Sequence, residues 1–144
     1  MIIKNGKLFF IPIILFLITF TLDSFVTHVG LSSGFMEGNP IILWLWKIFG
    51  NENIFLILIY PIFIIFISFL IGKKLSTRIG LTVLYSFGIG HLFGFSSWVY
   101  PKLINFFTFG LFYSLWQVSI YILIFFAILY GFVLTFLHLK FIKG

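Results

Sequence analysis

The sequence contains no cysteine and only three acidic residues, and charged residues of both signs make up just 8% of its 144 positions. Without cysteine the chain can form no disulfide, no thiolate metal site and no thiol nucleophile, and it cannot attach a c-type haem covalently. Soluble domains carry about a quarter charged residues, so the composition excludes an ordinary water-soluble domain. The nine basic residues lie singly or in short clusters between apolar runs, which excludes a nucleic-acid-binding surface.

Apolar residues dominate what is present: 62% of the chain is apolar, 23% is aromatic, and the mean hydropathy is +1.24. A helix that crosses about 30 Å of hydrocarbon needs roughly 20 mostly apolar residues, because it must satisfy its own backbone hydrogen bonds. Four segments meet this requirement, at about 8–29, 54–71, 79–99 and 118–139. We therefore predict an all-α integral membrane protein, a bundle of four transmembrane helices that forms a single domain over residues 1–144.

Two shorter apolar stretches, 41–49 and 103–116, fall below spanning length. These two stretches are consistent with interfacial segments, re-entrant segments or parts of longer helices.

Lysine and arginine are distributed unevenly between the two predicted membrane faces. Lys47 and Lys102 belong to one face, and the other face holds Lys4, Lys7, Lys73, Lys74, Arg78, Lys140 and Lys143. Since basic loops stay on the cytoplasmic side, both termini are predicted to be cytoplasmic in a multi-pass protein of the cell membrane. The lipid bilayer is then the principal partner, and the acidic residues belong to the outer half.

The third predicted helix carries small residues at every fourth position, namely Thr82, Ser86, Gly90 and Gly94. Small residues let membrane helices approach closely. The stripe therefore predicts helix packing, either with another helix of this chain or with a second subunit in a homo- or hetero-oligomer.

Asp23 is the acidic residue that falls inside a predicted span. A carboxylate at the bilayer centre costs about 2.5–3.5 kcal/mol on insertion scales, so such residues are usually functional. Thr19 and Thr27 lie four residues to either side of it and extend a polar stripe that should face other helices. The structural alternative is a packing Asp that is hydrogen-bonded to a neighbouring helix.

Further metal-ligating residue types lie in the same outer half. His28 and Glu37 follow Asp23 along the chain, and His91 borders the small-residue stripe. Together with Asp23 they form a nitrogen and oxygen set that suits a divalent transition metal. The alternatives are a hydrogen-bonded packing role for each histidine and a solvated Glu37. Asn39 is a supporting polar residue that also suits a helix N-cap before Pro40.

At these positions the chain resembles an uncharacterised family of small prokaryotic polytopic membrane proteins. In that family the first helix ends in D-x-x-x-T and the following loop carries E-x-N-P. The matching residues are Asp23, Thr27, Glu37, Asn39 and Pro40. The resemblance implies that these residues act together and supplies no reaction, and neither histidine belongs to the signature.

Three classes of function are consistent with the sequence. The first is a non-catalytic subunit of a membrane assembly whose outer-half polar site binds a cation, favoured by the short chain and by the lack of a recognisable reaction motif. The second is an intramembrane metal-dependent enzyme with an open metal position that activates water. The third is an oligomeric conductor of protons, metal ions or small solutes.

Overall fold

The computed structural model describes residues 2–34, 47–48, 54–99 and 120–143, and this part of the chain is helical. Its long helices are α1 (Ile2–Ser32), α3 (Ile54–Lys74), α4 (Thr77–Val99) and α6 (Ile120–Lys143). They overlap the four predicted segments, so the all-α class is confirmed. The predicted pieces at 41–49 and 103–116 lie outside the described residues, apart from residues 47 and 48.

Three of the described helices are long and apolar enough to cross a membrane. Their candidate spans are Lys7–Ser32, Thr77–Val99 and Tyr121–Ile142. Apolar side chains such as Phe10, Phe132 and Phe136 are well exposed along α1 and α6. Because water disfavours such surfaces and hydrocarbon does not, these helices contact the lipid bilayer.

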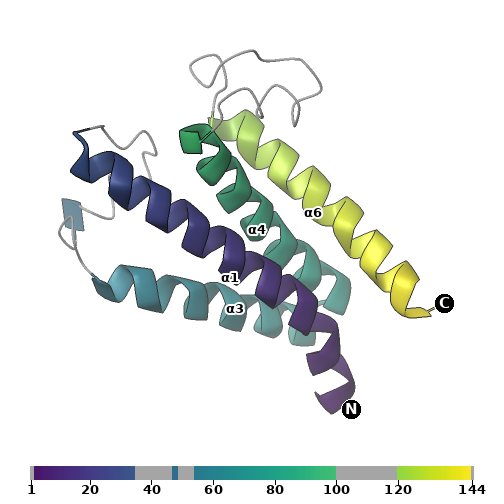
Figure 1. Cartoon of the computed structure of the whole chain (residues 1–144). Helices are drawn as coiled ribbons and strands as arrows, with labels where there is room; N and C mark the ends of the chain where they lie inside the picture. The colour runs from purple at the N-terminus through teal and green to yellow at the C-terminus, as the bar shows by residue number, and fades with distance from the viewer. Residues whose placement is uncertain (1, 35–46, 49–53, 100–119, 144) are drawn as a thin grey trace.

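Helix α4 is the centre of the fold and packs against α1, α3 and α6, whereas α1 touches α3 only slightly. Figure 1 shows α4 between α1 and α6, with both chain ends at the same end of the molecule. Along α4, Gly88 meets Phe16 and Gly94 meets Asp23, so α1 and α4 run parallel. Thr82 pairs with Thr135 and Ser86 meets Gly131, so α6 runs antiparallel to α4.

The turn between α3 and α4 is short, and Ser76 immediately precedes α4. The Ser76 hydroxyl accepts a hydrogen bond from the backbone N–H of Arg78 at 3.3 Å, which is the role of an N-cap residue. The carbonyl of Ser76 accepts the N–H of Gly80 as the first helical bond. This turn lies at the same end as both chain termini and carries the exposed basic side chains Lys73, Lys74 and Arg78.

Glycines bring the α4 backbone close to α3 and α1. A Cβ atom at Gly80 would lie 2.5 Å from the Ser68 carbonyl oxygen and 2.8 Å from the Cα of Gly72, and one at Gly88 would lie 3.4 Å from the Cα of Phe16. Such close approach is how helices associate in lipid. One buried cluster, Phe9, Phe16, Ile64, Leu81 and Leu84, fills the space between α1, α3 and α4. A second cluster, Phe93, Phe126 and Ala127, lies between α4 and α6.

Candidate functional site

The face of α1 that meets α4 follows an alternating three- and four-residue spacing, and Asp23 lies on it. The buried or half-buried positions on this face are Phe9, Pro12, Phe16, Thr19, Asp23 and Gly30. This spacing keeps side chains on one seam between two helices. Because Asp23 lies on this packed face, its side chain points inward, as predicted.

Asp23, His91 and Tyr60 form a continuous hydrogen-bonded chain across three helices. Asp23 Oδ2 on α1 lies 2.8 Å from His91 Nδ1 on α4, and His91 Nε2 lies 3.2 Å from the Tyr60 hydroxyl on α3. With an ionised carboxylate, which can only accept, and a neutral imidazole, Nδ1 carries the proton, Nε2 is the acceptor, and Tyr60 donates its O–H. Both nitrogens of the imidazole are therefore partnered.

The chain is largely enclosed. The side chains of His91 and Asp23 are 17% and 19% exposed. Phe16, Phe20 and Tyr60 surround the imidazole with ring centroids at 5.8, 5.1 and 5.6 Å. In surroundings of this kind a hydrogen bond is stronger than in water, and an unpartnered polar group is more costly.

Gly94 provides the space for the carboxylate. A Cβ atom at this position would lie 2.5 Å from Asp23 Oδ1 and 2.7 Å from Oδ2. The residue was predicted as a helix-packing position, and in the structure its neighbour is α1 of the same chain. Its lack of a side chain lets Asp23 lie against α4 beside His91.

The other residues of the small-residue stripe on α4, Thr82, Ser86 and Gly90, have different neighbours from Gly94. Thr82 hydrogen-bonds to Thr135 of α6 at 3.1 Å, and Ser86 lies against Gly131 of the same helix. Gly90 is exposed, and a Cβ atom there would meet nothing within 4 Å. Residues four apart drift by about 40° around an α-helix, so the stripe turns gradually from α6 toward α1.

The other predicted site residues do not join this chain in the described structure. His28 is exposed and Thr27 is half-buried, while Thr19 is buried and its hydroxyl donates to the carbonyls of Leu15 and Phe16. Glu37 and Asn39 lie outside the described residues. Across the described part of the chain, no three His, Asp or Glu side chains gather as a metal-binding group.

Tyr60 was not predicted as a site residue. In the predicted span 54–71 the side-chain hydroxyls belong to Tyr60 and Ser68, and every other residue is apolar. That isolation was the available signal, because a polar group in an apolar span needs a partner on another helix.

A second polar contact lies between α4 and α6. The Tyr85 hydroxyl is 2.6 Å from His138 Nδ1, and the Thr82–Thr135 bond lies beside it. His138 was also not predicted as a site residue, and it lies near the end of the predicted span 118–139.

Comparisons with protein-family models, curated proteins and solved structures found no match for this chain. The candidate site therefore rests on its geometry.

Proposed function

We propose that this chain is a small, non-catalytic subunit of a membrane assembly, and that it binds a proton at the Asp23–His91–Tyr60 chain. The observation that carries the proposal is the unbroken hydrogen-bonded path from a carboxylate through an imidazole to a phenol. These three groups come from three different helices, so a change in protonation acts on the packing of all three.

The proposed topology has four spans, with α3 as the fourth, and both termini in the cytoplasm. The distribution of basic residues between the two ends of the fold supports this topology. Lys7, Lys73, Lys74, Arg78 and Lys140 all lie at the end that holds both chain termini, as the positive-inside rule requires of a cytoplasmic face. Asp23 and His91 then belong to the outer half of the membrane.

The direction of one hydrogen bond depends on the bound proton. When the imidazole is neutral, His91 Nε2 accepts the Tyr60 O–H. A proton added at Nε2 turns the ring into a donor at both nitrogens, and the Tyr60 oxygen must then accept. Asp23 stabilises the resulting positive charge at 2.8 Å. Proton binding thus reverses the α3–α4 contact and leaves the α1–α4 contact in place.

This arrangement favours proton binding over nucleophilic catalysis. The hydroxyl that faces Nε2 is a phenol packed among Phe16, Phe20 and Phe87. Catalytic triads instead place an accessible Ser or similar nucleophile at this nitrogen.

Nitrogen-15 NMR of histidine-labelled protein in lipid tests the proton site, with His91→Gln used to assign the signals. We expect the neutral ring of His91 to carry its proton on Nδ1, and the charged ring to carry a proton on both nitrogens. Tyr60→Phe should change the Nε2 signal and leave Nδ1 nearly unchanged, whereas the control Tyr121→Phe on exposed α6 surface should change neither. A neutral ring with a bare Nδ1, or a ring that takes no second proton while the protein stays folded, would contradict the proposal.

The subunit role has a separate test. Light scattering during size-exclusion chromatography in mild detergent should give a particle larger than one chain plus its detergent. A clean and stable monomer would count strongly against the subunit role, and it would leave the proposed proton site untouched.

A metal-dependent enzyme is the second candidate, and one observation favours it. Histidines that ligate metals usually donate their other ring nitrogen to a carboxylate, as His91 does to Asp23. A metal at Nε2 would replace Tyr60 as the partner of that nitrogen, with Glu37 and His28 as the remaining predicted ligands. Elemental analysis of the purified chain should then find stoichiometric divalent metal that His91→Ala removes. Protein that is metal-free even when purified with added divalent metal would reject this candidate.

A further inference from the structure

Each long helix of the described structure carries an exposed basic side chain at the same end of the fold, where both chain termini also lie (Figure 1). The side chains at this end, which we call the basic end, are Lys7 of α1, Lys73 and Lys74 of α3, Arg78 of α4 and Lys140 of α6. The positive charge thus comes from four helices and not from one segment.

Apolar packing holds these helix ends close to one another. Leu8 of α1 and Leu139 of α6 pack against one buried cluster that also has members from α3 and α4. Lys7 is the neighbour of Leu8 in the chain, and Lys140 is the neighbour of Leu139. The other three basic residues lie at the short turn between α3 and α4. Burial of apolar side chains, which is favourable, therefore brings like charges together.

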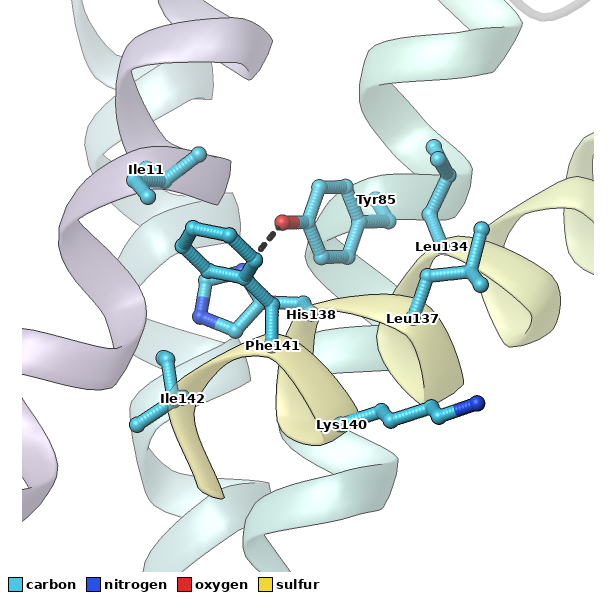
Figure 2. Close-up of a pocket in the computed structure, with 8 residues that line it drawn as sticks. All are labelled: Ile11, Tyr85, Leu134, Leu137, His138, Lys140, Phe141 and Ile142. Carbon is cyan, nitrogen blue, oxygen red and sulfur yellow. Dashed lines mark hydrogen bonds between the residues drawn. The ribbon is translucent and has the colours of Figure 1, made fainter. Parts of the chain in front are cut away.

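The described residues contain no acidic side chain that neutralises the basic end. Asp23 is the one acidic residue among them, and it pairs with His91. Asp23 lies 16 residues from Lys7, which is about 24 Å along α1. Salt screens exposed charges at such a distance. Figure 2 shows the Lys140 ammonium directed away from His138 and from α1. Within the described structure, the counter-charge therefore has to come from outside the protein.

The basic end lies where the candidate membrane spans end. Two of these spans begin at Lys7 and Thr77, and the third finishes at Ile142, two residues after Lys140. Lysine and arginine side chains near the end of a span extend toward the headgroup layer. Anionic headgroups in that layer attract them. Lipid phosphates are therefore the negative charges closest to these side chains.

We propose that the basic end binds the headgroups of anionic phospholipids in the leaflet that surrounds it. The phosphates reduce the repulsion among the basic side chains and thereby stabilise the packing of the four helix ends. Lipid is favoured over an acidic protein partner, because the charges are spread over four helices and lie at the level of the headgroups. This surface is independent of the proton site, because Asp23 lies in the other half of α1.

Thermal unfolding of the full chain in lipid nanodiscs tests the lipid and its charge. The probes are phosphatidylglycerol and phosphatidylcholine with identical acyl chains. We expect phosphatidylglycerol to raise the unfolding midpoint by about 5 °C. Added NaCl at about 1 M should remove most of this gain, because it shortens the Debye length to about 3 Å. Equal midpoints in the two lipids would overturn the proposal, and so would a gain that persists in high salt.

Charge-matched variants locate the surface. Lys73→Gln with Lys74→Gln should lose roughly half of the gain in phosphatidylglycerol. Both lysines are exposed, so their replacement leaves the packed core intact. The control, Lys47→Gln with Lys102→Gln, removes the same charge at the predicted opposite face and should keep the gain.

Two outcomes of this comparison would contradict the proposed surface. An equal loss in both pairs of variants would mean that the lipid responds only to the net charge of the chain. If the variant of the α3–α4 turn kept the gain but lost a co-purifying acidic protein, the surface would belong to that protein instead.

Discussion

The face of α4 that packs against α1 and α3 differs from the face that packs against α6 in the kind of polar contact that it holds. The first face contains His91, whose two ring nitrogens bond to Asp23 and Tyr60. At the second face, Thr82 and Tyr85 of α4 contact Thr135 and His138 of α6, and His138 Nε2 has no partner in the described residues. One helix thus separates a closed hydrogen-bonded chain that includes a carboxylate from an incomplete set of contacts that includes none.

This difference has a physical consequence. A closed chain that includes a carboxylate is sensitive to the loss of any member, because the charged group would remain enclosed. Neutral interhelical hydrogen bonds in membranes contribute only about 0.6 kcal/mol on average. Perturbing the two faces should therefore give effects of clearly different size, although both faces depend equally on close backbone packing.

The largest effect should come from backbone packing. Gly80→Ala is expected to lower stability by about 3 kcal/mol, because overpacking is costly and its Cβ would meet backbone atoms of Ser68 and Gly72. The matched control is Gly90→Ala, whose Cβ meets nothing within 4 Å. It should be neutral or up to about 1 kcal/mol stabilising through helix propensity. Thermal unfolding in detergent checks both, and equal effects would show that α4 does not approach α3 as described.

The next largest loss of stability should come from the face of α4 that contains His91. Asp23→Ala is expected to cost about 2 kcal/mol, because it leaves the enclosed His91 Nδ1 without an acceptor. In a double-mutant cycle with His91→Ala, unfolding measurements should give a coupling free energy of at least about 1 kcal/mol. Additive losses would mean that the two side chains do not interact in the membrane-embedded protein.

Tyr85→Phe tests the face toward α6 and should cost about 1 kcal/mol, because it removes the partner of His138 Nδ1. A cost as large as that of Asp23→Ala would remove the distinction between the two faces.

The smallest effect is expected for Thr82→Val, at about 0.6 kcal/mol. Thr135 keeps its own hydrogen bond to the carbonyl of Gly131, so no buried donor is left without an acceptor. Thr21→Val, whose hydroxyl bonds only within α1, is the control for the change in residue type. A loss above about 2 kcal/mol in the unfolding measurement would place Thr82 in a larger network than the structure shows.

Both residues of the Asp23–His91 contact could be predicted from the sequence, but the contact itself could not. Asp23 and His91 were both singled out, because ionisable groups in apolar spans are rare and need partners. Their direct bond could not be derived, since 68 residues separate them and no pattern fixes which helices are neighbours. Tyr60 was missed for the same reason, as its hydroxyl has significance only beside His91.

The sequence by itself determined that this is a helical membrane protein, because apolar content and segment length decide whether a chain can satisfy its backbone in lipid. It also determined that small residues line α4, because composition and spacing are properties of the chain. Only the tertiary structure decided that those small residues contact two different helices, that Asp23 bonds to His91, and that Tyr85 bonds to His138. Such contacts depend on the order and rotation of packed helices, which local residue preferences leave open.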